Sequence, residues 1–93
     1  MNGFSFDNEN RLVIDRNVLV DYIGTLPNNG NVTVTLNGAA LNNGLWTLNN
    51  NMLRIGKAGI PVAAGQYVIT NPSGGTLSFE ITPDGEIVIL NAE

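Results

Sequence analysis

Apolar and polar residues alternate along several short stretches of this chain, which is the pattern of half-buried β-strands. Residues 31–37 place three aliphatic side chains on one face and two threonines on the other, and residues 76–82 repeat the pattern around Phe79. The stretches expected to form strands are 4–6, 11–14, 31–37, 45–48, 52–55, 66–70, 76–82 and 87–90. Seven or eight short strands at a spacing of about 8–12 residues predict an all-β sandwich of antiparallel strands.

Turn chemistry separates these stretches. Asn37-Gly38 and Asn43-Gly44 are dipeptides typical of tight turns. Pro83-Asp84-Gly85 predicts a type I turn in which Gly85 takes the left-handed conformation of a bulged hairpin. Residues 58–65 contain two glycines and a proline, so we expect them to cross from one sheet to the other.

Residues 15–24 fit two structures. Their apolar positions fall at helical spacing, with Asp15 placed to cap a helix and Gly24 to end it. Val18-Leu19-Val20 is equally good strand material, so a short helix and a strand both stay open.

Two runs are apolar without alternation, at residues 12–14 and 87–90. An unbroken apolar run requires that both faces of the strand are covered, or that one face meets a partner. Both runs are therefore candidate partner-facing edges.

Composition narrows the class of protein. The 93 residues are enough for one core, so we expect a single domain over 1–93. Lys+Arg is 4 against Asp+Glu 8, and the formal net charge of −4 argues against nucleic acid as a partner. Cysteine and histidine are absent, which excludes disulfides, thiolate chemistry, Cys/His zinc sites and histidine general bases.

Localisation rests on what the chain does not contain. No stretch approaches the ~20 apolar residues that span a bilayer, so no membrane partner is expected. No signal peptide is visible after Met1. With Met1 as the native start, we expect synthesis in the cytoplasm; for a fragment of a larger protein, a cell-surface or extracellular location is expected instead.

An ordered series of short motifs runs through the middle and the end of the chain. The motifs are Val34-Thr35-Leu36-Asn37-Gly38, Leu41, Gly44, Trp46-Thr47-Leu48, Met52-Leu53-Arg54-Ile55, Ala64-Gly65-Gln66-Tyr67 and Leu77-Ser78-Phe79-Glu80-Ile81. Over residues 32–82 this series resembles the bacterial X2-type modules found beside cellulase and scaffoldin domains. The resemblance implies an Ig-like fold and attachment to a surface or a polysaccharide. It carries over no catalytic residue, because that family is not catalytic.

Candidate binding residues are few. Trp46 is the single tryptophan, and its ring predicts either a part of the core or a platform for a sugar or a partner. Asparagine-rich tips offer amide donors and acceptors to carbohydrate or to a neighbouring subunit. The candidates are Trp46, Asn42, Asn43, Asn49, Asn50 and Asn51.

The acidic residues predict neither a metal site nor catalysis. Asp7, Glu9 and Asp15 are close in sequence but lack the glycine and the distal glutamate of a calcium loop, so we expect turn carboxylates and no metal or cofactor. Paired carboxylates such as Asp84 and Glu86 hydrolyse glycosides only beside a substrate cleft, for which a chain of this size has little volume. We therefore expect no enzyme activity.

Charged residues make up only 13% of the chain, so much of its surface is neutral. The centres of protein interfaces are depleted in charged residues, and neutral polar groups carry a small desolvation penalty compared with charged groups when they are buried. We expect a structural or interaction domain that packs on itself or on a larger assembly, such as a capsid-decoration or tail protein of a bacterial virus. A carbohydrate- or cell-surface-binding module is the alternative, and a designed or excised domain without a role of its own is the third.

Overall fold

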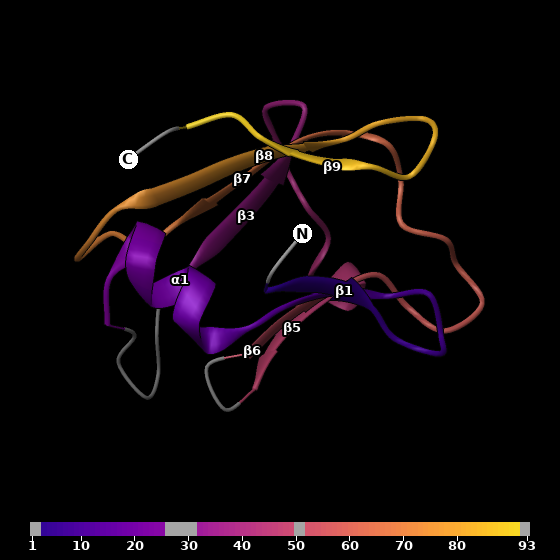
Figure 1. Cartoon of the computed structure of the whole chain (residues 1–93), viewed down its shortest axis with the longest axis horizontal. Coiled ribbons are helices and arrows are strands. Elements are labelled where there is room, and N and C mark those ends of the chain that lie inside the picture. The colour runs from indigo at the N-terminus through magenta and orange to yellow at the C-terminus, as the bar shows by residue number, and fades with distance from the viewer. Residues whose placement is uncertain (1–2, 26–31, 50–51, 92–93) are drawn as a thin grey trace.

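The computed structural model describes residues 3–25, 32–49 and 52–91. Within them the chain forms two layers of antiparallel strands with one short helix at their side (Figure 1), so the all-β sandwich is confirmed. The elements are β1 (Phe4–Phe6), β2 (Leu12–Ile14), α1 (Arg16–Ile23), β3 (Thr33–Leu36), β4 (Ala39–Ala40), a 3-10 turn (Asn43–Leu45), β5 (Trp46–Asn49), β6 (Met52–Ile55), β7 (Gly65–Thr70), β8 (Thr76–Ile81) and β9 (Ile87–Ile89).

The order of the strands within the sheets is that of the immunoglobulin fold. One sheet runs β1-β2-β6-β5 and the other β4-β3-β7-β8-β9. Lettered along the chain, these orders are A-B-E-D and C′-C-F-G, with β9 added beyond the last lettered strand. The helix α1 lies in the connection from β2 to β3, which joins the two sheets.

Tyr67, near the start of β7, forms the tyrosine corner of immunoglobulin-like sandwiches. Its hydroxyl donates a hydrogen bond of 2.6 Å to the carbonyl oxygen of Ala63, four residues upstream. The ring is buried, and this burial raises the pKa of the hydroxyl, which therefore stays a neutral donor. The bond fixes the end of the crossing segment to the strand that follows it.

Aromatic rings join the two sheets at the centre of the core. Tyr67 and Phe79 lie side by side in the five-stranded sheet, with ring centroids 5.3 Å apart and an interplanar angle of 8°. Phe4 of the other sheet meets Phe79 edge-on at 5.6 Å. Such pairs contribute ~0.5–1.5 kcal/mol beyond the apolar area that they bury. The buried apolar residues are Phe4, Leu12, Ile14, Leu19, Ile23, Val32, Val34, Leu53, Ile55, Tyr67, Ile69, Leu77, Phe79 and Ile81.

The open choice at residues 15–24 is settled as a helix. Asp15 is its N-cap and accepts a hydrogen bond of 3.2 Å from the backbone N–H of Val18, while Gly24 ends the helix at a φ of 84°. The helix buries Leu19 and Ile23 against β6 and β8. In the part of the chain that the structure describes, no helix has the length and the apolar run needed to cross a membrane.

Each of the eight expected strands is present, and the structure adds the two-residue β4. The Asn37-Gly38 turn and the Gly85 turn have the expected positive φ angles. A tight turn is also present at Asn43-Gly44, closed by a bond of 2.8 Å from Leu45 N–H to the carbonyl of Asn42, but it does not join two strands of a hairpin. These residues lie in the 3-10 turn, because the side chain of Asn42 accepts from the N–H of Gly44 and holds the chain in a helical rather than a hairpin turn.

The two apolar runs have different places in the sheets. Residues 12–14 form β2, which pairs with β1 on one side and β6 on the other, so the expectation of an edge was wrong there. The second run, residues 87–90, contains β9, which pairs only with β8 within the described chain. β9 is therefore an edge strand, as expected.

Candidate functional site

Strand β5 places its two candidate binding residues on opposite faces of the four-stranded sheet. Trp46 is half-buried and packs against the core together with Leu48. Asn49 is exposed on the outer face beside Thr47. Because side chains alternate along a strand, Trp46 and Asn49 do not contribute to one surface.

The remaining asparagines do not gather at a site. Asn42 is exposed, but its side-chain oxygen already accepts a hydrogen bond of 2.8 Å from the N–H of Gly44. Asn43 starts the 3-10 turn, and its side chain is outside the described part of the structure. Asn50 and Asn51 also lie outside the described residues.

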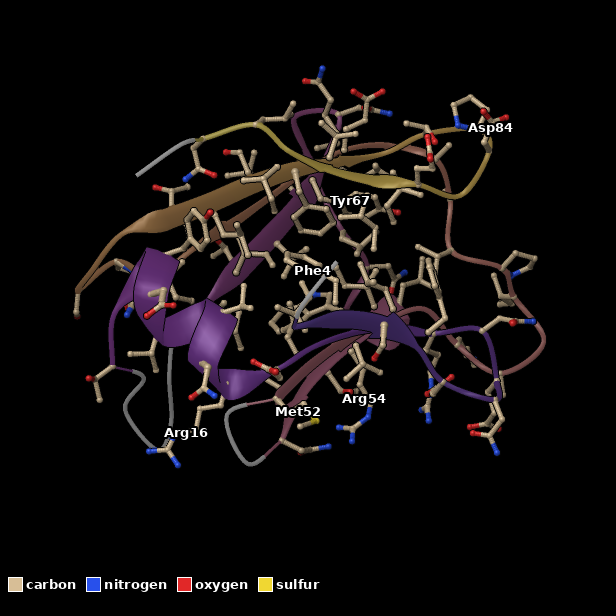
Figure 2. All side chains as sticks on the ribbon, in the orientation of Figure 1. Phe4, Arg16, Met52, Arg54, Tyr67 and Asp84 are labelled. Carbon is tan, nitrogen blue, oxygen red and sulfur yellow. The ribbon has the colours of Figure 1, made fainter. Side chains whose placement is uncertain are left out.

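Asn49 does border a shallow hollow of about 580 Å³ on the outer face of the four-stranded sheet, together with Arg11, Thr47 and Arg54. Figure 2 shows Arg54 and Met52 on this outer side of the molecule, where the Arg54 guanidinium donates to the Met52 sulfur at 3.6 Å. Among the described residues, no carboxylate lies within ion-pair distance of Arg54. The hollow therefore offers guanidinium, amide and hydroxyl groups to a polar ligand.

The acidic turn between β1 and β2 is held by Arg11. The Asp7 carboxylate accepts from the backbone N–H groups of Arg11 and Glu9, each at 2.9 Å, and from Arg11 Nε at 2.8 Å. The backbone N–H of Arg11 contributes most to lowering the pKa of Asp7, with further lowering from its side chain. Glu9 pairs with the same guanidinium at 3.0 Å. Over the described ranges, no three metal-ligating side chains come together.

Two of the five large hydrophobic residues that are exposed in the described chain lie together on the strand at the end of the five-stranded sheet, which we call the β9 edge and define as residues 87–90. Val88 and Leu90 are 44% and 45% exposed, while Ile87 and Ile89 are half-buried and pack against the core. Figure 1 shows β9 along one margin of its layer. The strand contains no charged residue and no proline, so it lacks two features that commonly protect sheet edges.

A second apolar feature was not anticipated from the sequence. Phe4, Ser5 and Phe6 alternate, which predicts that both phenylalanines point inward, yet Phe6 is 46% exposed. It borders a hollow of about 310 Å³ with Val62, Ile81 and the prolines of the neighbouring turns. This hollow is at the end of the sandwich away from α1, near Asp84 in Figure 2. No local signal in residues 4–6 distinguishes the exposed Phe6 from the buried Phe4.

The fold and these surfaces define an immunoglobulin-like sandwich that presents one apolar sheet edge. Comparisons with family models, curated proteins and solved structures find no match to the chain. The resemblance to X2-type modules stays a prediction, and the assignment of function rests on the chain's own residues.

Proposed function

We propose that this chain is a non-catalytic interaction module that packs, through its β9 edge, beside copies of itself or on a larger protein assembly. The observation that supports the proposal is the β9 edge, where a strand that pairs on one side only is apolar on both faces. Exposed apolar edges of this kind add strands from other chains. An isolated globular protein gains nothing from leaving such an edge unprotected.

The rest of the surface fits the same role. The outer face of the five-stranded sheet consists largely of threonine, serine, glutamine and valine, with Glu80 as its acidic residue on β8. Covering such a face with another protein costs less hydration free energy than covering a charged face would. The stacked and edge-on aromatic rings of Phe4, Tyr67 and Phe79 hold the two sheets together at the centre, which suits a repeated structural unit.

The concrete setting that we propose is the particle of a bacterial virus, as a capsid-decoration or tail-associated protein. A lattice presents many copies at short distances, so contacts that are weak in solution become sufficient there.

Co-sedimentation tests this proposal. The purified chain is mixed with capsids or tails assembled from the genes that flank its own, and the particles are pelleted through a sucrose cushion. We expect the wild-type chain in the pellet at a fixed ratio to the major particle protein. A variant with Val88→Lys is expected to remain in the supernatant, and Val20→Lys, altered at an exposed valine of α1, serves as the matched control. A wild-type chain that stays in the supernatant contradicts the proposal.

A second candidate function is carbohydrate binding, which the hollow around Asn49 and Arg54 favours. Its test is titration with soluble glycans followed by NMR, because Trp46 packs inward and its fluorescence is expected to report poorly on this face. Shifts confined to Thr47, Asn49 and Arg54, lost in Asn49→Ala, support sugar binding. No shift at millimolar glycan removes this candidate.

A further inference from the structure

The backbone of β9 has one side bonded to β8 and one side without a partner. Thr82 N–H donates to the carbonyl of Glu86 at 2.9 Å, and Leu90 N–H donates to the carbonyl of Ser78 at 2.8 Å. In an antiparallel pair, every second residue bonds its neighbour strand and the residues between them point away. Residues 86, 88 and 90 therefore face β8, while Ile87 and Ile89 turn two N–H and two C=O groups outward. No hydrogen bond to these four groups occurs among the described residues.

We infer that these groups pair with the same groups of a second copy of this chain, antiparallel and about a two-fold axis at Val88, so that two five-stranded sheets become one of ten strands. This inference rests on the proposed function and names the partner of the β9 edge. In this register Ile87 lies opposite Ile89 of the second copy, and Ile89 lies opposite Ile87. Each of these two pairs exchanges two bonds, which gives four backbone hydrogen bonds.

The side chains fit the two-fold pairing. Val88 meets its own counterpart at a position without backbone bonds, where Cα atoms come within ~4.5 Å and side chains pack closely. Ile87 and Ile89 are half-buried because the sheet ends beside them, and the second copy would cover their open side. Leu90 comes to lie opposite the aliphatic part of Glu86 of the second copy.

A bulge at the end of β9 selects this register. The N–H groups of Leu90 and Asn91 both point at the carbonyl of Ser78, at 2.8 and 3.4 Å. The Asn91 side chain also accepts from Ser78 N–H at 2.8 Å and donates to the carbonyl of Thr76. Leu90 and Asn91 thus lie opposite the single residue Ser78, and this β-bulge ends the regular pairing of β9 with β8 after Leu90. A pairing shifted by two residues toward the C-terminus would need a straight backbone at Asn91, and one shifted the other way would need extended backbone at Gly85, whose φ of 88° belongs to the turn.

The Glu80 carboxylates do not oppose the pairing, although each copy is negative. Glu80 lies opposite Val88 on the same face of the sheet. In the ten-stranded sheet the two Glu80 carboxylates are three strand spacings apart, about 14 Å. That separation exceeds the Debye length of about 8 Å at physiological salt, so their repulsion is largely screened.

The small size of the contact predicts a weak dimer. Only residues 86–90 of each copy take part, so the buried area is below that of a standard interface. We expect a dissociation constant on the order of 10⁻⁴ M in solution. Copies held on a particle at effective concentrations in the millimolar range would be largely paired.

Sedimentation velocity from 10 µM to 1 mM tests the inference on the full chain. We expect the wild type to pass from monomer to dimer over this range, and Val88→Lys and Val88→Glu each to stay monomeric, because like charges would face each other at the axis. Val20→Lys is expected to dimerise as the wild type does. An equimolar mixture of the Lys and Glu variants at position 88 should regain the dimer, a result that misfolded variants cannot give.

Amide hydrogen exchange supplies the second readout. The Ile87 and Ile89 amides should become protected only at concentrations at which the dimer forms, whereas the Val88 amide is protected at all of them. A wild-type chain that is monomeric at 1 mM overturns the inference, even if a peptide of another sequence adds to β9. Unchanged dimerisation of Val88→Lys overturns it as well. If the monomeric chain still co-sediments with particles, the proposed function stands and only the self-pairing fails.

Discussion

The side-chain amide of Asn71 donates a hydrogen bond of 2.9 Å to the backbone carbonyl of Ile23, 48 residues earlier in the chain. Ile23 is the last residue of α1, and its carbonyl also accepts from Gly75 N–H at 3.1 Å. The turn after β7 thus satisfies a carbonyl that a helix end would otherwise leave without a partner. Asn71 is the one buried polar residue of the described chain, and it joins the helix to the β7–β8 hairpin.

Replacing Asn71 with alanine should lower the free energy of unfolding by about 2 kcal/mol, because the bonds to Ile23 and to Ser73 N–H are both lost. Asn71→Asp should cost more at neutral pH, since a buried carboxylate would face the Ile23 carbonyl. Urea denaturation followed by circular dichroism measures both effects. Asn8→Ala, at an exposed turn position, is the control and should change stability by less than about 0.5 kcal/mol. Equal losses at the two positions would contradict the account.

Position 74 requires glycine because there is no room for a side chain, and not because of a positive φ angle. A Cβ atom at this position would overlap the carbonyl oxygen of Ile23, which cannot move without disturbing the end of α1. We expect Gly74→Ala to cost more than about 2 kcal/mol. Gly44→Ala is the matched control, because its nearest neighbour would be the Asn42 side-chain oxygen at 3.4 Å and its φ is not positive. The thermal unfolding midpoints of the two variants should differ by several degrees. Similar midpoints would contradict the prediction and show that the end of α1 can shift to make room for the Cβ atom.

Removing the hydroxyl of Tyr67 separates the corner bond from the ring packing. Tyr67→Phe keeps the ring beside Phe79 but loses the bond to Ala63, so we expect a loss of about 1–1.5 kcal/mol. Tyr22→Phe is the control, since the Tyr22 hydroxyl makes no hydrogen bond within the described residues. Denaturant unfolding compares the two variants. A larger loss in Tyr22→Phe would show that the corner bond does not stabilise the crossing segment.

The hydrogen bonds of the Asp7 carboxylate make the free energy of unfolding depend on pH in the acid range. Hydrogen bonds, foremost from the backbone N–H of Arg11, hold the pKa of Asp7 in the folded state below its ordinary value of 3.8. The stabilisation from this carboxylate is therefore complete above pH 3.8 and is lost as the pH falls through the lower folded value. The stability difference between wild type and Asp7→Asn should shrink as the pH is lowered from 6 to 2.

The Arg11→Met variant tests which bond lowers the pKa of Asp7. This variant keeps the backbone N–H of residue 11 and loses the guanidinium, so NMR titration should still show a lowered pKa for Asp7. An Asp7 that titrates at its ordinary value in Arg11→Met would show that the side chain dominates.

The candidate site was only partly predictable. The unbroken apolar run at residues 87–90 indicated a partner-facing strand, and the structure places it at a sheet edge. The equally apolar run at residues 12–14 lies inside the other sheet, and nothing local distinguishes the two. Tryptophan and asparagine are common both in binding surfaces and in ordinary strands and turns, so their presence did not identify a site. The alternation of side chains along β5 places Trp46 and Asn49 on opposite faces of the sheet.

The sequence alone predicted eight of the strands, most of the turns and the two residues that would bound a helix at 15–24, but it left the choice between helix and strand open there. These features depend on neighbouring residues: alternation marks β3 and β8, and Asp15 and Gly24 bound α1. Only the tertiary structure decided which strand is interior, that Phe6 is exposed and that Asn71 is buried. Those properties depend on pairing between segments far apart in the chain. The residues of a strand do not by themselves specify which other strands will pair with it.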